Sequence, residues 1–278
     1  MIEIGKYNDL KILRETSVGI FLGDGEEDVL LPKKYMPEEF NFGDILHVFV
    51  YRDYEERKVA VTDVPKIKLH EFSFLKVTDV SEIGAFLDWG MEKELLVPFK
   101  EQRLKMVEGR WYVVYLDIDK VTDRLFASNR IDKYLDNSEL SVKHGEEVDL
   151  LVYHQSELGY NVIVNNKHNG LVFKNEIFKV LNVGDRLKGY VKKIREDNKL
   201  DISIQAIGFE NYNDKNSETI LKALSKKDGF LSLNDKSSPE EIYSSLGMSK
   251  KAFKKSVGSL YKQGKIIIEE NGVRLVKE

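Results

Sequence analysis

The sequence contains no cysteine among its 278 residues. Disulfides, thiolate metal sites and cysteine nucleophiles are therefore all excluded, and the absence of cysteine suits a reducing compartment. No apolar run approaches the ~20 residues that a membrane-spanning helix needs. The N-terminus also lacks a basic segment followed by an apolar one, which is the pattern of a secretion signal. We expect a soluble cytoplasmic protein with no membrane partner.

Catalytic and cofactor-binding patterns are also scarce. The five histidines show no paired metal-ligand spacing, and the sequence has no G-x-x-x-x-G-K-S/T loop for nucleotide phosphates. Asp117, Asp119 and Asp123 could suggest a metal-dependent nuclease, but their place before a hairpin turn favours a role in turn formation. We therefore predict no enzymatic activity, no cofactor and no metal site.

A pattern of glycine, aromatic residue and turn recurs three times along the chain. The glycine-containing strands of the three copies are residues 18–22, 83–90 and 158–162. A second apolar run ends 13 or 14 residues after each glycine, at Pro32, Pro98 or Phe173. Each copy has about five short β-branched and aromatic strands in ~60 residues, separated by Gly, Asp and Asn turns. With a short helical connection after its third strand, each copy predicts a closed five-stranded barrel of the oligonucleotide-binding (OB) fold.

After residue 207 the apolar periodicity changes from two to roughly 3.6, which predicts helices in place of strands. Three helices are expected, with N-caps at Ser217, Ser238 and Ser249. The apolar face of the third helix is expected to contain Phe253, Val257, Leu260 and Tyr261. Two strands that turn at Asn271–Gly272 complete a winged helix, whose helix-turn-helix flanks Gly247.

The predicted fold is thus multidomain and mainly β, with three tandem five-stranded OB barrels followed by an α+β winged-helix domain. The expected domains are residues 1–65, residues 67–140 including a helical linker, residues 144–208 and residues 214–278. Charge changes along these segments. Residues 1–66 carry 9 Lys and Arg against 14 Asp and Glu, whereas residues 208–278 carry 13 against 10. The C-terminal half is therefore the better candidate for nucleic-acid contact.

Two sets of residues connect this chain to a known family. They are Gly84–Asp88 with Leu95–Pro98 in the second copy, and Gly184–Asp185 with Lys188–Val191 and Lys199–Ile204 in the third. Both sets resemble the S1 RNA-binding domain, and three S1-like repeats before a winged helix resemble the CvfB/YitL family of bacterial RNA-binding proteins over almost the whole chain. The resemblance implies post-transcriptional regulation through RNA without a known catalytic step.

In S1 domains the aromatic residue after the glycine stacks on a base, and the matching residues here are Phe21, Phe86 and Tyr160. Stacking on a single strand contributes ~1–3 kcal/mol per base, although alternate aromatics also fill barrel cores. Many S1 domains place a histidine after the second apolar run. Proline replaces it in the first two copies, whereas Phe173 in the third could itself stack on a base, so we expect the third barrel to keep more of the binding surface.

Basic residues gather in the third copy and in the tail. The third copy carries Lys188, Lys192, Lys193 and Arg195 around Tyr190. The tail carries Lys250, Lys251, Lys254 and Lys255 at helical spacing. Both sets suit neutralisation of phosphates, and lysine alone favours backbone contact over base readout. A solvated turn or helix face would look similar, and Arg124, Phe126 and Arg130 form a weaker set in the second copy.

These patterns predict a monomer that binds single-stranded RNA mainly through the third barrel and the winged helix, with the first two barrels as scaffold or auxiliary surface. Two alternatives stay open. One is a transcriptional regulator that binds duplex DNA through the winged helix, and the other is a protein-interaction scaffold.

Overall fold

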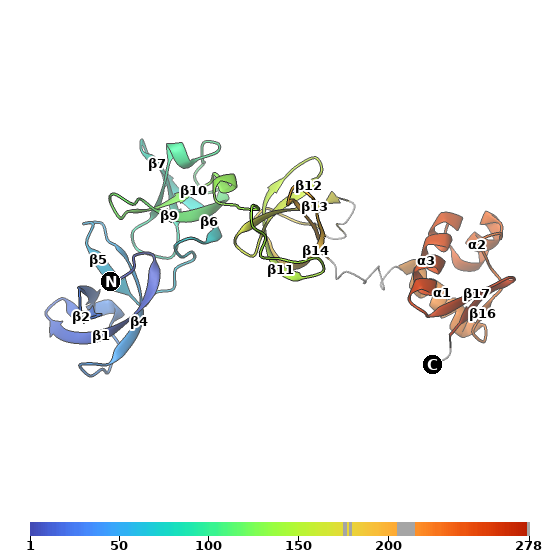
Figure 1. The fold of residues 1–278 in the computed structure, drawn as a ribbon, viewed down its shortest axis with the longest axis horizontal. Helices are drawn as coiled ribbons and strands as arrows, with labels where there is room; N and C mark the ends of the chain where they lie inside the picture. The colour runs from blue at the N-terminus through green and yellow to red at the C-terminus, as the bar shows by residue number, and fades with distance from the viewer. Residues whose placement is uncertain (175–176, 178–179, 205–214, 277–278) are drawn as a thin grey trace. The chain divides into compact units, whose positions relative to one another are not determined.

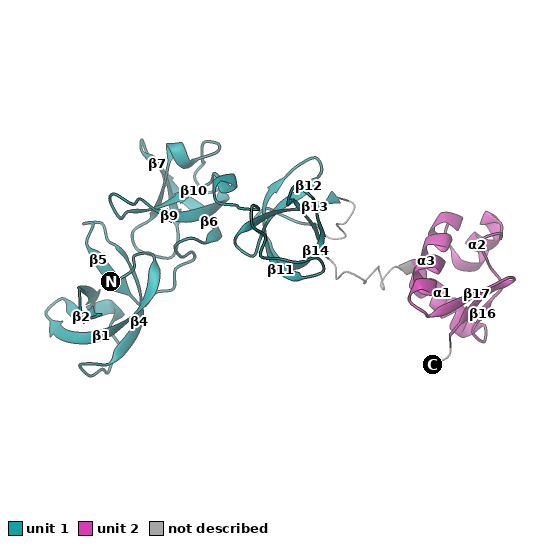
Figure 2. Cartoon of the chain, in the orientation of Figure 1, with its two compact units in different colours: residues 1–204 teal, residues 205–278 magenta. Residues whose placement is uncertain are grey.

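The computed structural model describes residues 1–174, 177, 180–204 and 215–276 (Figure 1). The chain forms two compact units, residues 1–204 and residues 205–278 (Figure 2). The first unit contains three five-stranded β domains, and the second combines three helices with a small sheet. The predicted fold class is confirmed. Within the described ranges, no helix is long and apolar enough to cross a membrane.

The first domain is a closed barrel with the strand order β1-β2-β3-β5-β4. Its strands are β1 (Lys6–Thr16), β2 (Gly19–Gly23), β3 (Asp28–Pro32), β4 (Ile45–Arg52) and β5 (Lys58–Val61). β3 and β5 pair in parallel, and the other neighbours are antiparallel. Alternate apolar residues such as Ile20, Leu22 and Leu31 fill the interior, as the period of two in the sequence requires.

The second and third domains repeat this topology. The second contains β6 (Phe72–Val80), β7 (Gly84–Asp88), β8 (Leu95–Pro98), β9 (Trp111–Ile118) and β10 (Leu125–Ser128). Its sheet has the order β10-β9-β6-β7-β8, and its edge strands β8 and β10 lie next to each other, so the barrel is nearly closed. The third contains β11 (Glu147–Gln155), β12 (Gly159–Val164), β13 (His168–Phe173), β14 (Arg186–Ile194) and β15 (Leu200–Ser203), and it is closed.

One glycine in each barrel establishes which residues are equivalent. Gly19, Gly84 and Gly159 begin β2, β7 and β12. A Cβ at any of them would lie 2.0 to 2.3 Å from a carbonyl oxygen of the facing strand, so only glycine fits there. The three glycines therefore hold the same position in the three barrels.

The helical connections are shorter than the sequence suggested. Single 3₁₀ turns, η1 (Lys33–Tyr35) and η2 (Phe99–Glu101), follow the third strand in the first two barrels. In the third barrel most of this connection lies outside the described residues. The expected helical linker at residues 131–136 is one 3₁₀ turn, η3 (Ile131–Lys133).

A shared hydrophobic core joins the first two barrels. Trp89, which is 2% exposed, follows β7 and lies edge-on to Phe49 and Tyr51 of β4, with ring centroids 5.9 and 5.7 Å apart. Its indole Nε1 donates a hydrogen bond to the carbonyl oxygen of Lys93 at 2.6 Å. The two barrels are thus packed against each other through an aromatic contact.

A second cluster joins the second barrel to the third. Phe72, Leu151 and Ile163 are buried in it. The backbone N–H of Phe72 donates to Oδ1 of Asn166 at 3.1 Å, and Nη2 of Arg186 donates to the carbonyl oxygen of Phe72 at 2.6 Å. All three barrels therefore belong to one packed unit.

The second unit is a three-helix domain with a three-stranded sheet. Its elements are α1 (Lys215–Lys226), β16 (Phe230–Leu231), α2 (Pro239–Leu246), α3 (Lys250–Lys262), β17 (Ile266–Glu269) and β18 (Gly272–Leu275). The predicted caps of α2 and α3 are confirmed. Oγ of Ser238 accepts from the N–H of Glu241 at 3.1 Å, and Oγ of Ser249 accepts from the N–H of Ala252 at 3.2 Å. Gly247 ends α2 in the left-handed conformation.

Several predicted details of this domain are wrong. Ser217 lies inside α1, where its buried hydroxyl has no hydrogen-bond partner among the described residues, so it does not cap the helix. Tyr261 is 55% exposed, because its position on α3 faces away from the apolar side. The hairpin turns at residues 270–271, and Gly272 already pairs within β18. The short strand β16 was not expected.

Candidate nucleic-acid interface

In the first two barrels an aromatic residue stands on the outer surface, two positions after the repeat glycine. Phe21 and Phe86 are half-buried there, whereas the preceding Ile20 and Ala85 are 0% exposed and point inward. Successive side chains of a strand alternate between its faces, so both aromatics are placed where a base could stack.

Tyr160 does not share this position. It follows Gly159 directly and pairs with Val172, which is fully buried, and its ring packs against the core of the third barrel. The residue equivalent to Phe86 is Asn161. The predicted equivalence of Tyr160 with the outward aromatics is therefore wrong, because an offset of one residue reverses the face of a strand.

The predicted set of the third barrel divides into two groups along β14. At the start of the strand, Nζ of Lys188 pairs with a carboxylate oxygen of Asp149 at 2.8 Å, and the hydroxyl of Tyr190 donates to Glu147 at 2.9 Å. The carboxylate of Asp149 raises the pKa of Lys188. Both predicted residues therefore bind carboxylates of the neighbouring strand β11.

The second group lies at the other end of β14, around Asp201. Nε and Nη2 of Arg195 bind Oδ1 of Asp201 at 2.9 and 2.8 Å, and the guanidinium lies 5.7 Å from the centroid of the Phe173 ring. Lys193 pairs in register with Asp201, is exposed, and forms no ion pair with a described residue. Lys192 occupies the bulge before it, also exposed. The structure thus brings Phe173, Arg195 and Lys193 together on one outer surface.

A cleft of about 670 Å³ lies between the first and second barrels, which we call the interbarrel cleft. Its apolar wall on the second barrel includes Phe86, Leu96 and Phe126. Its opposite wall on the first barrel includes Tyr51, Arg52, Tyr54 and Glu56. Lys93, Lys100 and Arg124 also line it. Phe86, Arg124 and Phe126 are candidates from the sequence, but the sequence does not indicate that they lie next to residues of the first barrel.

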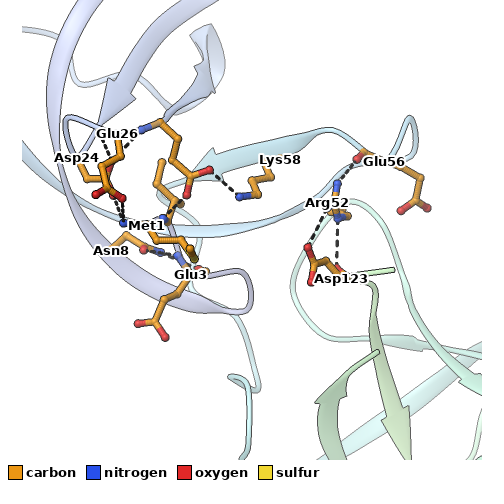
Figure 3. Close-up of polar contacts among 11 residues, drawn as sticks. Met1, Glu3, Asn8, Asp24, Glu26, Arg52, Glu56, Lys58 and Asp123 are labelled. Carbon is orange, nitrogen blue, oxygen red and sulfur yellow. Dashed lines mark hydrogen bonds and ion pairs between the residues drawn. The ribbon is translucent and has the colours of Figure 1, made fainter. Parts of the chain in front are cut away.

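Polar contacts clamp the β4–β5 hairpin of the first barrel onto the second. Oε1 of Glu56 accepts from Nζ of Lys93 at 2.8 Å, and its Oε2 accepts from Nε of Arg124 at 3.2 Å. Arg52 donates to the carbonyl oxygen of Asp123 at 3.2 Å and to that of Glu56 at 2.7 Å (Figure 3). Lys93 and, to a smaller extent, Arg124 lower the pKa of Glu56.

The aspartates at the β9–β10 turn have a structural explanation. Oδ1 of Asp119 accepts from the backbone N–H groups of Val121 and Thr122 at 3.0 and 2.9 Å. These hydrogen bonds lower the pKa of Asp119. The interpretation of this residue as a turn former is confirmed.

Helix α3 carries the most concentrated positive charge of the second unit. Its 13 residues include five lysines and no acidic residue. Lys251, Lys254 and Lys255 are exposed, Lys250 is half-buried, and none of the four forms an ion pair with any residue that the structure describes. Gly258 lies in the middle of the same helix with open space around its Cα.

Three OB barrels with outward aromatics, followed by a winged helix with a lysine-rich helix, define a multidomain nucleic-acid-binding protein. A family model of the S1 domain matches residues 4–63, and a model of the CvfB-like winged helix domain matches residues 218–275. Both families are nucleic-acid-binding domains and not enzyme families.

Full-length relatives agree with these matches. The chain is 31% identical to the uncharacterized protein YitL of Bacillus subtilis, over 96% of this chain and 92% of that protein. It is 27% identical to the conserved virulence factor B of Staphylococcus epidermidis, over 99% and 95%. A crystal structure of a multidomain protein with nucleic acid binding domains from Streptococcus pneumoniae is 26% identical, covers 98% of each chain and gives a TM-score of 0.42. The chain belongs to the CvfB/YitL family, as the sequence predicted.

Proposed function

We propose that this protein binds single-stranded RNA and acts as a cytoplasmic post-transcriptional regulator. The observation that carries the proposal is the surface of α3, where Lys251, Lys254 and Lys255 are exposed and have no acidic partner among the described residues. Cations that are free of carboxylates can release the counterions of a phosphate backbone, and this release supplies most of the sequence-independent affinity for nucleic acids.

The barrels favour a single strand over a duplex. Phe86 and Phe173 stand on outer strand surfaces, where an unpaired base can stack on them, whereas the bases of a duplex are covered by their neighbours. In the third barrel, Lys193 and Arg195 would accompany Phe173, with Lys192 beside them. Tyr160 faces the core, and Lys188 and Tyr190 are held by carboxylates, so we leave these three out of the proposed contact surface.

The proposal is tested by the salt dependence of RNA binding by the full chain. The test variant replaces three exposed lysines of α3: Lys251→Ala, Lys254→Ala and Lys255→Ala. For single strands the slope of log affinity against log salt changes by ~0.7 per phosphate contact, so the variant should lose ~2 of its slope. Binding is measured by fluorescence anisotropy of a labelled oligoribonucleotide over a salt series.

A matched control removes the same charge from the same unit: Lys222→Ala, Lys226→Ala and Lys227→Ala. These lysines are exposed on α1 and in the turn after it. The control should keep its slope. Equal losses in the two variants would mean that only net charge matters, and the assignment of RNA contact to α3 would be abandoned.

Duplex DNA is the second candidate ligand, because α3 is the second helix of the helix-turn-helix, the element that enters a major groove in groove-reading domains. Competition separates the two ligands. Displacement of labelled RNA by duplex DNA at lower concentration than by unlabelled RNA of the same sequence would favour the DNA-binding alternative. Binding of neither nucleic acid would favour a protein-interaction scaffold.

A further inference from the structure

Strand β17 forms an open edge of the small sheet in the second unit. The strand order is β16-β18-β17, so β17 pairs with β18 on one side, and its other side has no strand among the described residues. Its middle residues, Ile267 and Ile268, are 50% and 47% exposed. Successive side chains of a strand point to opposite faces, so apolar surface lies on both faces of this edge. An edge of this kind is a template for pairing with another strand.

The hydrogen bonds of the hairpin show which backbone groups point to the open side. The N–H of Val276 donates to the carbonyl oxygen of Lys265 at 2.9 Å. Residues of an antiparallel pair alternate between bonded and non-bonded positions, so Ile267 bonds to β18 whereas its neighbours Ile266 and Ile268 do not. The N–H and C=O groups of Ile266 and Ile268 therefore face the open side, where no described residue bonds to them.

This edge is complementary to a second copy of itself. The segment Lys265–Glu269 is one basic residue, three isoleucines and one acidic residue. In an antiparallel pair centred on Ile267, the two Ile267 side chains face each other on the twofold axis. Ile266 then lies opposite the partner's Ile268, and these two residues can exchange both of their backbone hydrogen bonds, since both point to the open side.

The charges at the two ends of the segment agree with the same register. Lys265 and Glu269 lie on the same face as Ile267, because side chains two positions apart share a face. The centred pair places Lys265 opposite the partner's Glu269, and opposite charges at facing positions stabilise a strand pair. The carboxylate of Glu269 binds Arg274 of β18, and 38% of its side chain is still exposed, so it can accept from a second cation.

We propose that two copies of this chain associate through β17, in an antiparallel pair centred on Ile267 that joins their small sheets into one. This dimer departs from the monomer that the sequence predicts, because the sequence alone does not show which strand lies at an open edge. The dimer contains two copies of α3, so an RNA long enough to reach both gains affinity through bivalent binding. That consequence rests on the proposed function, whereas the pairing itself does not.

Sedimentation velocity of the full chain without RNA measures the association. We expect the mass of the particle to rise with concentration from one chain to two. Ile267→Lys places two like charges opposite each other on the axis, which destabilises a strand pair. It should weaken association at least tenfold, which corresponds to ~1.4 kcal/mol. The control Ile45→Lys adds the same charge at a 62% exposed isoleucine of the first barrel and should associate as the wild type does. Circular dichroism verifies that both variants fold.

The absence of cysteine from the chain allows a second test, which measures the register. In the proposed pair the Cα atoms of the two Ile267 residues lie ~4.5 Å apart, which is within the range of a disulfide. Air oxidation of Ile267→Cys should therefore give a cross-linked dimer on a non-reducing gel. Ile268→Cys is the control. The two Ile268 residues are diagonal neighbours, ~7–8 Å apart, which exceeds the usual disulfide range, so this variant should remain a single chain.

Three results would overturn the proposal. The first is a wild type that stays a single chain up to ~1 mM, which would leave the edge to a strand of another protein. The second is equal association of Ile267→Lys and Ile45→Lys, and the third is equal cross-linking of the two cysteine variants. The α3 lysine variant should still dimerise, so failure of RNA binding at α3 is distinguishable from failure of the pairing.

Discussion

Replacing Trp89 by alanine should separate the first two barrels, because this side chain fills the space between them. Its ring contacts Phe49 and Tyr51 of the first barrel, and its indole N–H binds the carbonyl oxygen of Lys93. Trp89 also lines the interbarrel cleft. One substitution therefore tests whether this contact holds the two barrels together.

Trp89→Ala is expected to lower the free energy of unfolding strongly. Truncation of a buried aromatic side chain to alanine destabilises by about 3–5 kcal/mol, and Trp89 is 2% exposed. With a urea slope of ~3 kcal/mol/M, at the upper end of the usual range, the midpoint of unfolding should fall by more than ~1 M. Trp89→Phe keeps an aromatic ring but loses the hydrogen bond and part of the volume, so it should cost roughly 1–2 kcal/mol.

The assay is urea unfolding of the wild-type chain and of each variant, followed by circular dichroism. Trp111→Ala is the matched control. Its ring is 50% exposed and stacks on Phe74 at 5.4 Å, so its removal should lower the free energy of unfolding by no more than ~1 kcal/mol. Equal costs for the two tryptophans would refute the shared core as the element that holds the barrels together.

Three further predictions concern individual side chains. Because the pKa of Glu56 is lowered in the fold, its ion pairs stabilise the protein at pH values above the ordinary glutamate pKa. This contribution, below ~1 kcal/mol for so exposed a pair, is lost as the pH falls through the lowered pKa. Unfolding measured from pH 6 down to pH 3 should show the loss in the wild type and not in Glu56→Gln. Gly258→Ala should raise the free energy of unfolding by ~1 kcal/mol, but it should weaken RNA binding if a phosphate backbone approaches α3 at this residue. Thermal unfolding measures the first effect, and fluorescence anisotropy with labelled RNA measures the second. Tyr160→Ala should lower the free energy of unfolding by ~2 kcal/mol, whereas Asn161→Ala should change it by less than ~0.5 kcal/mol. Urea unfolding compares the two variants, and equal losses of stability would contradict the inward placement of Tyr160.

The strands could be predicted from the sequence because their signals are local. Glycines at the turns and alternating apolar residues place β2, β7 and β12 within a residue or two, and Ser238 before Pro239 fixes the start of α2. The face of the strand on which a given side chain lies is harder to predict from the sequence than the strand itself. Gly159 is followed at once by its aromatic residue, whereas Gly84 has one residue between, and only the pairing with the facing strand shows which side chain points outward.

The candidate sites depend on neighbours that are distant in sequence. The lysines of β14 form a basic group in the sequence. In the structure, however, Asp149 and Glu147 of β11 pair with the ammonium group of Lys188, and Glu147 accepts a hydrogen bond from the hydroxyl of Tyr190. The interbarrel cleft joins Glu56 of one barrel to Arg124 of the next, 68 residues apart. A count of charges by segment cannot reveal such pairs, because it contains no information on which strands and barrels are adjacent.

The most direct test of RNA binding is a competition experiment on the full chain at one fixed salt concentration. A labelled single-stranded oligoribonucleotide is bound first, and unlabelled RNA or duplex DNA of the same sequence is then added to the wild type and to the α3 lysine variant. We expect the single-stranded RNA to displace the label at lower concentration than the duplex, and the variant to bind the label more weakly. Preferential displacement by the duplex, or unchanged affinity in the variant, would contradict single-stranded RNA binding through α3.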